Sequence, residues 1–186
     1  MNVLVFAAST RRESLNSRLA AHAADLVRGL GHTVDHATLR DFDMPLFDGD
    51  AEATTGLPPG ALALKRRLEA ATAVVLATPE YNYSIPGTLK NAIDWTSRAR
   101  PMPWRGRSMY LMSASPSPIG GIRGLWQTRI PLEGCGALVY PDMFALARAD
   151  QAFDAAGGLA DAGMEARLHK ELAAFLRVAE AVAPVL

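Results

Sequence analysis

Short apolar runs alternate with polar loops and with longer segments of helical periodicity along this chain. Continuous apolar runs are typical of strands buried on both faces, and apolar residues repeating every three to four positions are typical of amphipathic helices. The run at 33–37 alternates between apolar and polar residues, so we expect it at a sheet edge. The pattern predicts five strands, at 3–7, 33–37, 73–77, 108–112 and 137–140.

Five helices are expected between and after these strands. Gly31 suits the end of the first helix, Pro131 is expected to end or kink the fourth, and Asp161 is expected to cap the last. The third is an amphipathic helix after Pro86, with Leu89, Ala92, Ile93 and Thr96 on one face. The others cover 15–30, 60–71, 122–133 and 161–182, and polar loops are expected at 40–59, 98–107 and 113–121.

Strands that alternate with helices predict an α/β fold with a parallel sheet, right-handed crossovers and helices on both faces. For five strands this favours the flavodoxin-like order 2-1-3-4-5. No internal repeat or linker divides the 186 residues, so we expect a single domain over 1–186. The loops after the first, third and fourth strands then meet at one sheet edge, which is where ligands bind in open α/β sheets.

Composition narrows the possible classes of protein. The formal net charge is zero and there is no long basic run, which argues against a nucleic-acid binder. Cys135 is the only cysteine, so neither an intramolecular disulfide nor a cysteine cluster for zinc is expected, as is typical of a reducing compartment. The first apolar run is too short for a signal peptide, and no run approaches the ~20 residues of a membrane span. We expect a soluble, cytoplasmic protein.

The first loop, at 9–16, is rich in hydroxyl and basic groups and leads into a helix. Ser9, Ser14 and Asn16 can donate to phosphate oxygens, Arg11 adds a forked cation, and the helix start at Leu15 adds free N–H groups. Neither G-x-x-x-x-G-K-[ST] nor G-x-G-x-x-G is present, so a single phosphate fits better than a triphosphate or pyrophosphate. The alternative is a solvated turn in which Ser14 only caps the helix.

The second loop opens the segment PEYNYSIPGTLKNAIDW, at 79–95. This segment resembles the signature of the NAD(P)H-dependent FMN reductase family, which includes quinone, azo-dye and chromate reductases. The first loop is similar to the family's G-S-x-R-x-x-S-x-N, and 113–123 is similar to its S-x-S-P-x-x-x-G-G-x-R. The segment 152–161 is similar to a late family motif, F-D-x-x-G-x-L-x-D. Ala8, Glu13 and Ser117 depart from the pattern, and Glu13 must point outward if a phosphate binds here.

For the second loop, which begins at Pro79, the resemblance implies contacts with the flavin ring. The backbone N–H groups of Tyr81, Asn82 and Tyr83 are expected to bond N5 and the carbonyl oxygens of the ring. Glu80 and Asn82 are expected to hold the loop or the ribityl chain, and the two tyrosines are expected to flank the ring. The alternative is a tight loop whose tyrosines pack on neighbouring helices.

For the third loop, the resemblance implies close approach of the backbone to the flavin. Ser113, Ser115 and Gly120 are the candidate residues, since small side chains leave room for the ring and the ribityl chain. Ser117 stands where family members often have glycine. Arg123 is a candidate for an anionic part of the nicotinamide nucleotide, with a structural ion pair as the alternative.

The resemblance also implies the activity. NADPH or NADH passes a hydride to bound FMN, and a small acceptor such as a quinone, azo dye, nitroaromatic, free flavin or metal oxyanion then takes the electrons. Because the cofactor carries this chemistry, neither a catalytic side chain nor a metal ion is expected.

Relatives are usually dimers or tetramers, so we expect a homodimer or homotetramer with 40–59 and 98–104 as candidate interface or lid. The alternatives are a flavodoxin-type electron carrier, which usually has an acidic face, and a non-catalytic protein of this fold.

The remaining chemically capable residues are expected to be structural. His22, His32, His36 and His169 lie outside the three loops. Cys135 is expected to be a small buried residue, and Trp95 a packing residue. Trp104 and Trp126 are placed near the edge of the site and are candidates for a subunit contact.

Overall fold

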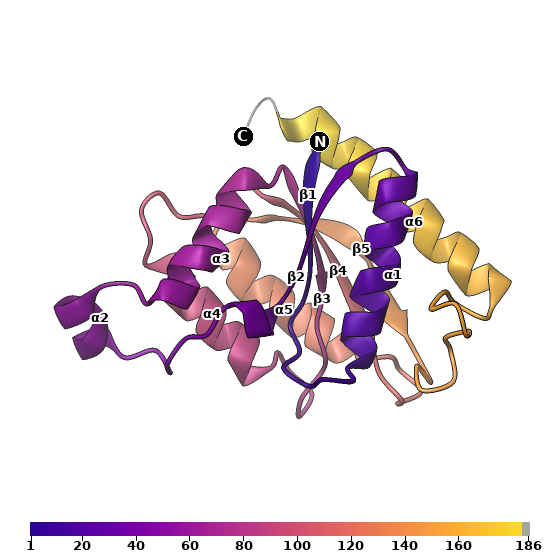
Figure 1. Cartoon of the computed structure of the whole chain (residues 1–186), viewed down its shortest axis with the longest axis horizontal. Coiled ribbons are helices and arrows are strands. Elements are labelled where there is room, and N and C mark those ends of the chain that lie inside the picture. Colours follow the sequence, from indigo (N-terminus) through magenta and orange to yellow (C-terminus); the bar gives the residue numbers. More distant parts are fainter. Residues whose placement is uncertain (184–186) are drawn as a thin grey trace.

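The computed structural model describes residues 1–183, so 184–186, the end of the expected domain, lie outside the described residues. Five strands form one sheet in the order β2-β1-β3-β4-β5, and every neighbouring pair is parallel (Figure 1). The predicted order is therefore confirmed. The elements are β1 (Asn2–Ala7), α1 (Leu15–Gly29), β2 (Thr33–Thr38), the 3₁₀ helix η1 (Leu39–Asp41), α2 (Gly49–Thr55), α3 (Pro59–Ala70), β3 (Ala73–Ala77), α4 (Gly87–Ser97), β4 (Ser108–Ala114), α5 (Ile122–Gly134), β5 (Leu138–Leu146) and α6 (Ala162–Val182).

The three central strands are buried on both faces because helices cover both sides of the sheet. Every residue of β3 and β4 is buried, as is all of β1 after its first residue. On one face, α1 and α6 pack over a core that includes Leu19, Phe144 and Phe175. On the other face, α3, α4 and α5 pack over a second core, which includes Leu64 and Leu125. Burying each of these large side chains contributes roughly 1.5–3 kcal/mol.

The fifth strand is longer than the sequence pattern predicts. It was expected at 137–140 but runs from Leu138 to Leu146. Val139 pairs with Met109 and Met143 pairs with Leu111, so β5 has three residues opposite one residue of β4. This irregularity holds Pro141, which the strand tolerates because β5 lies at the sheet edge and bulges there.

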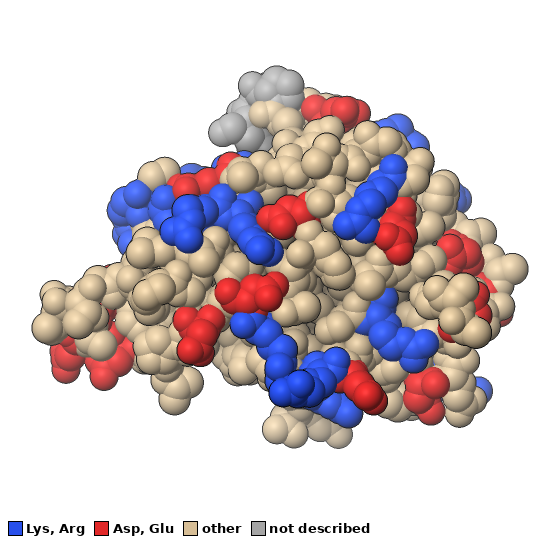
Figure 2. Space-filling view, viewed as in Figure 1, with Lys and Arg blue, Asp and Glu red and all other residues tan. Residues whose placement is uncertain are grey.

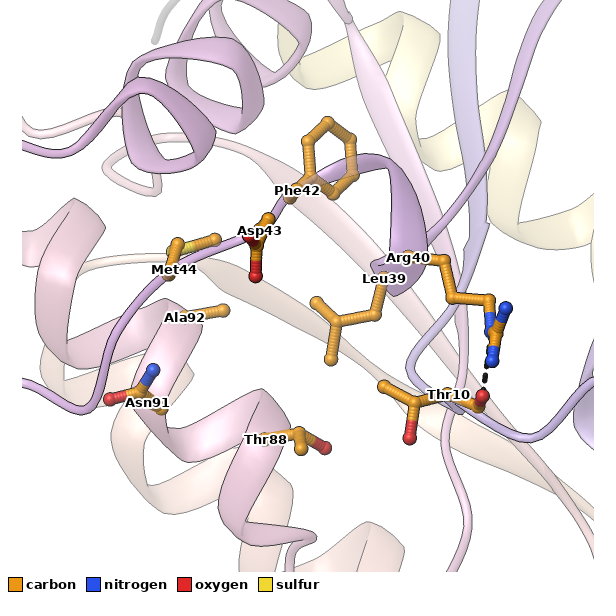
Figure 3. Close-up of a pocket in the computed structure, with 9 residues that line it drawn as sticks. All are labelled: Thr10, Leu39, Arg40, Phe42, Asp43, Met44, Thr88, Asn91 and Ala92. Carbon is orange, nitrogen blue, oxygen red and sulfur yellow. Dashed lines mark hydrogen bonds between the residues drawn. The ribbon is translucent and has the colours of Figure 1, made fainter.

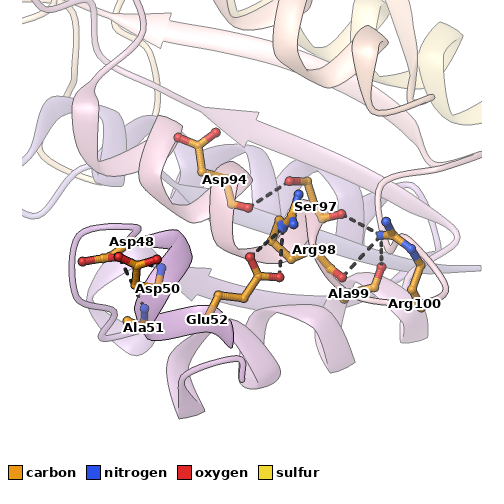
Figure 4. A network of polar contacts seen from close by, with 9 residues as sticks. All are labelled: Asp48, Asp50, Ala51, Glu52, Asp94, Ser97, Arg98, Ala99 and Arg100. Carbon is orange, nitrogen blue, oxygen red and sulfur yellow. Dashed lines mark hydrogen bonds and ion pairs between the residues drawn. The ribbon is translucent and has the colours of Figure 1, made fainter. Parts of the chain in front are cut away.

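The expected loop at 40–59 is wrong in two places, since it contains the end of η1 and all of α2. Asp48 caps α2 by accepting hydrogen bonds from the N–H groups of Asp50 and Ala51. None of the residues of α2 is buried, and the helix projects from the body of the protein (Figure 1). It is tied to the C-cap of α4 by Arg98, whose Nε lies 2.9 and 2.8 Å from the two carboxylate oxygens of Glu52 (Figure 4).

Two further expectations concern Pro131 and Trp104. Pro131 does not end α5, which continues to Gly134 although proline lacks the N–H that a helix interior uses, and a kink at Pro131 stays a prediction. Trp104 was placed at the site edge, but its side chain is fully buried and its indole N–H donates to Thr96 Oγ1 at 2.8 Å. Its role is therefore packing between α4 and the sheet. No helix within residues 1–183 is long and apolar enough to cross a membrane.

Candidate functional site

The loops that follow β1, β3 and β4 meet around a cavity of about 100 Å³. This is the convergence that the predicted strand order requires, because these three strands are neighbours in the sheet. Ala114 and Pro116 also line the cavity, although they were not among the candidate residues. Their place inside the motif at 113–123 could have indicated them. The lining residues are Ser9, Arg11, Ser14, Leu15, Asn16, Pro79, Glu80, Tyr81, Ala114, Ser115 and Pro116.

The first loop places two buried hydroxyl groups at the amino end of α1. The side chain of Ser14 caps this helix and accepts a hydrogen bond from the N–H of Ser17 at 3.3 Å. Ser9 and Ser14 are only 3% and 4% exposed, whereas Arg11 is exposed at the cavity. Glu13 is exposed and does not line this cavity, as the phosphate hypothesis requires. The arrangement suits an anion, since hydroxyl donors, a helix start and a guanidinium surround it.

Asn16 has a structural task at this site. Its Nδ2 donates to the Ala114 carbonyl at 2.9 Å, and its Oδ1 accepts from the Ala114 N–H at 3.0 Å. Both bonds are buried and join α1 to the end of β4. Asn16 therefore holds the first and third loops together, and its direct bond to a phosphate stays a prediction.

The second loop forms a tight turn between Tyr81 and Ser84. The two residues exchange backbone hydrogen bonds of 3.1 and 3.0 Å, so the N–H of Tyr81 is used within the turn, contrary to expectation. Asn82 and Tyr83 both have positive φ, at 48° and 67°, as in a type I′ turn. Within residues 1–183, the N–H groups of Asn82 and Tyr83 donate to no protein acceptor. Only these two of the three expected N–H groups are free to meet a ligand.

The tyrosines of this turn are exposed, at 45% for Tyr81 and 67% for Tyr83. The alternative in which both pack on neighbouring helices therefore holds at most in part. The ring of Tyr83 lies 4.0 Å from the guanidinium carbon of Arg123, which is on α5. Positive φ at a bulky residue such as tyrosine is uncommon and is found mostly in turns or at sites under functional constraint.

Glu80 joins this turn to the start of α5. One of its carboxylate oxygens accepts from Arg123 Nε at 2.9 Å and from Nη2 at 2.5 Å, and the other accepts from the Gly124 N–H at 3.0 Å. Burial alone raises the pKa of Glu80, but the bonds from Arg123 and Gly124 outweigh it and hold the pKa below its ordinary value. Arg123 thus forms the structural ion pair that the sequence analysis left open, and its contact with a nicotinamide nucleotide stays a prediction.

The third loop is packed through small residues. A Cβ on Gly120 would lie 2.7 Å from the carbonyl carbon of Ala145, so only glycine fits against β5. Ser113 belongs to β4 rather than to the loop, and its buried hydroxyl has no partner among the described residues. The hydroxyls of Ser115 and Ser117 lie 3.2 Å apart. Of the candidates in this loop, only Ser115 reaches the cavity.

The cavity has the donor groups for a phosphate and is small for a whole cofactor. Its volume of about 100 Å³ lies below the roughly 300–1,000 Å³ of most small-molecule sites. A ring attached to a phosphate held here must therefore lie outside the cavity, along the exposed turn of the second loop. The free N–H groups of Asn82 and Tyr83 are suited to the polar edge of such a ring. The donor set therefore fits FMN.

Comparison with known proteins agrees with this geometry. A model of the NADPH-dependent FMN reductase family matches residues 1–151. The NAD(P)H-dependent FMN reductase of Pseudomonas aeruginosa is 35% identical over 168 residues, which cover 87% of this chain and 85% of that protein. The Escherichia coli quinone reductase is 42% identical over 97 residues, and the matched part spans about half of each chain, 52%.

Solved structures extend the similarity to the whole fold. FerB, a flavoenzyme NAD(P)H:(acceptor) oxidoreductase from Paracoccus denitrificans, has a TM-score of 0.81 and 30% identity, with 96% of this chain and 97% of that chain covered. A flavodoxin from Pseudomonas aeruginosa, at 18% identity and a TM-score of 0.60, shares the fold alone. The family match, over residues 1–151, covers the three site loops. The chain belongs to the NADPH-dependent FMN reductase family.

Proposed function

We propose that this protein is an FMN-dependent NAD(P)H oxidoreductase that reduces quinones or similar small acceptors. The observation that carries the proposal is the cavity at the carboxyl ends of β1, β3 and β4, where buried hydroxyls meet a helix start. When bound, FMN supplies the redox chemistry by taking a hydride from the nicotinamide and passing the electrons to the acceptor. The chain's own residues bind and orient the reactants.

Each loop has a separate task in this proposal. Ser9, Ser14 and Arg11 hold the phosphate at the start of α1. The N–H groups of Asn82 and Tyr83 face the polar edge of the ring, where hydrogen bonds set the electronics of a flavin. The exposed side chains of Tyr81 and Tyr83 exclude water from one side of the ring. No side chain of the site needs to act as a general acid or base.

A quinone is the acceptor that the relatives favour, since the E. coli relative is named a quinone reductase. Azo compounds, free flavin and metal oxyanions are further acceptors that this chemistry allows. A pure electron carrier of the flavodoxin type is less well supported. Such carriers dock through a face whose charged side chains are mostly of one sign. On the face shown in Figure 2, positive and negative side chains are interspersed.

The test is an anaerobic reduction of the FMN-loaded protein followed by absorbance. We expect the flavin absorbance to bleach on addition of NADPH or NADH, and to recover when a quinone is supplied. A flavin that binds but is bleached by neither nucleotide would support the carrier instead. Absence of FMN binding would contradict both functions and would leave the non-catalytic alternative.

We further infer a homo-oligomer that works in the cytoplasm as one domain. Trp126 and Ile130 lie one turn apart on α5, and their side chains are 57% and 65% exposed. Large apolar groups so close together at the surface are typical of a contact between proteins. Helix α5 begins beside Glu80 and Arg123, so a second copy bound here would lie next to the flavin site.

A further inference from the structure

A second and larger cavity, of about 510 Å³, lies between the first loop, the segment from η1 to Met44 and the start of α4 (Figure 3). Thr10 lines it, while its neighbours Ser9 and Arg11 line the phosphate cavity, so one loop separates the two. Its volume is within the range of small-molecule sites. None of the tasks assigned to the three loops uses this cavity. The lining residues are Thr10, Leu39, Arg40, Phe42, Asp43, Met44, Thr88, Asn91 and Ala92.

The lining combines an apolar wall with separated polar groups. Leu39, Phe42, Met44 and Ala92 form the apolar part, in which Met44 is the most exposed member and the ring of Phe42 points away from the other residues of the lining. Asn91 is already engaged, because its side-chain amide bonds the backbone of Pro45 and Phe47. Within residues 1–183, the hydroxyls of Thr10 and Thr88 and the carboxylate of Asp43 have no protein partner. These groups remain available to a ligand.

Arg40 is the cation of this cavity. Its Nε donates to the Thr10 carbonyl at 2.7 Å, which fixes the direction of the guanidinium. Its two Nη groups form no bond to any residue that the structure describes. An oriented guanidinium with two free donor groups matches the geometry of a phosphate.

We propose that this cavity receives the adenosine end of NADPH, with Arg40 as the residue that recognises the 2′-phosphate. The adenine lies beside Met44, the ribose meets Thr10, Thr88 or Asp43, and the phosphate meets the free side of Arg40. In dinucleotide sites an arginine accommodates the 2′-phosphate of NADP, and NADH lacks that group. This inference rests on the proposed function, because a nicotinamide nucleotide is the substrate which that function requires.

The contact from Arg40 to Thr10 also joins this cavity to the phosphate site of FMN. The first loop contributes Thr10 to one cavity and its neighbours Ser9 and Arg11 to the other. A nucleotide anchored by Arg40 is therefore held at a fixed place relative to the flavin. Such anchoring is how a remote part of a substrate helps to orient its reacting end.

The test uses adenosine 2′,5′-bisphosphate and 5′-AMP as probes, titrated calorimetrically into the FMN-loaded protein. We expect the bisphosphate to bind more tightly than AMP. In the Arg40→Ala variant, we expect the affinity for the bisphosphate to fall by about tenfold or more, which corresponds to a lost hydrogen bond to a charged group. The affinity for AMP should change little. Comparing two probes in one variant cancels any effect of a loosened loop, since both probes meet the same loop. The ratio of the KM values for NADPH and NADH should rise in parallel.

Two further variants complete the experiment. Thr88 is exposed and lines the cavity, so the larger side chain in Thr88→Phe should fill it. This variant should bind both probes more weakly and should keep its affinity for FMN. Arg177→Ala removes an exposed arginine on α6, on the opposite face of the sheet, and should change neither probe. If Arg40→Ala leaves the affinity for the bisphosphate unchanged, or lowers the affinities for both probes equally, Arg40 does not recognise the 2′-phosphate. If Thr88→Phe leaves both affinities unchanged, the cavity is not the binding site.

The failure of this inference differs from the failure of the proposed function. Flavin bleaching by NADPH together with probe binding that ignores Arg40 and Thr88 would leave the reductase standing and overturn the cavity assignment. Arg40-dependent binding of the bisphosphate without bleaching by either nucleotide would support the cavity and contradict the reductase.

Discussion

At the residue scale, Glu80 connects two of the three site loops through one carboxylate. It binds the guanidinium of Arg123 and the N–H of Gly124, and Arg123 in turn stacks on Tyr83. The side chain of Glu80 is only 10% exposed. If its hydrogen bonds are lost, few water molecules can reach the carboxylate to replace them, so the loss is costly. The position of the turn that carries the free N–H groups therefore depends on this carboxylate.

We expect Glu80→Gln to lower the free energy of unfolding by about 1–3 kcal/mol, because bonds between charged groups become weaker or are lost. FMN affinity should also fall, since the turn that carries Asn82 and Tyr83 is no longer fixed. Urea unfolding and flavin fluorescence measure the two effects. Asp25→Asn is the matched control, because it breaks an exposed pair with Arg28 and should cost at most ~0.5 kcal/mol. Equal losses in both variants would contradict the special role of Glu80.

The same carboxylate predicts a dependence of stability on pH. Its pKa is lower in the folded protein than the ordinary value of 4.5, because the bonds from Arg123 and Gly124 outweigh the effect of burial. A lowered pKa contributes stability above the ordinary pKa, and this stability is lost as the pH falls through the folded pKa. The difference in unfolding free energy between wild type and Glu80→Gln should therefore shrink below about pH 4.5. A difference that is constant from pH 7 to pH 3 would contradict the assignment.

At the element scale, the central strands and the edge strand β2 were predictable, whereas β5 and α2 were not. The continuous apolar runs of β1 and β3 reflect burial on both faces, so their bounds followed closely from the sequence. In β5, Pro141 and Asp142 are tolerated because the strand lies at the exposed sheet edge. Because proline and aspartate are uncommon in strands, they interrupted the apolar pattern, and the second half of β5 was not predicted. Helix α2 was missed because it buries nothing, although Asp48 is a recognisable cap.

The convergence of the candidate residues was predictable for a different reason, since they follow strand ends in recognisable motifs. Most of them line the cavity at the ends of β1, β3 and β4, and their contacts with FMN stay a prediction. The sequence did not reveal that Tyr81 uses its own N–H in the turn, or that Glu80 is engaged with Arg123. Those contacts depend on side-chain geometry between separate elements. The role of Arg40 in the second cavity depends on a bond across 30 positions, to Thr10, for which no local signal exists.

The turn into α5 predicts a sharp requirement for glycine at 121. Gly121 has φ of 85°, and a Cβ there would lie 2.2 Å from the Oγ of Ser113. We expect Gly121→Ala to lower the free energy of unfolding by roughly 2–4 kcal/mol, combining backbone strain with overpacking. Chemical denaturation measures this loss. Gly29→Ala is the control, since its Cβ meets nothing within 4 Å and alanine should stabilise the end of α1 by roughly 0.5–1 kcal/mol.

At the scale of the whole molecule, the proposed contact between copies of the chain is on the surface of α5 beside the site. Trp126 and Ile130 are each more than half exposed on this helix. Burying such side chains against a second copy contributes roughly 1.5–3 kcal/mol each per subunit. The interface would extend toward Tyr83 and Arg123, which stack at the start of the same helix. Assembly and flavin binding are therefore expected to be coupled.

We expect the wild-type protein to form dimers or tetramers, and Ile130→Glu to shift it to a smaller species, because burying an unpaired carboxylate in an apolar contact is costly. Light scattering coupled to size-exclusion chromatography measures the mass directly. Val178→Glu is the control, since Val178 is 47% exposed on α6 at the other face of the sheet and should leave the mass unchanged. The smaller species should also bind FMN less tightly, because the flavin site lies beside α5. A monomeric wild type, or equal masses for Ile130→Glu and wild type, would place the contact elsewhere and leave Trp126 and Ile130 as plain surface residues.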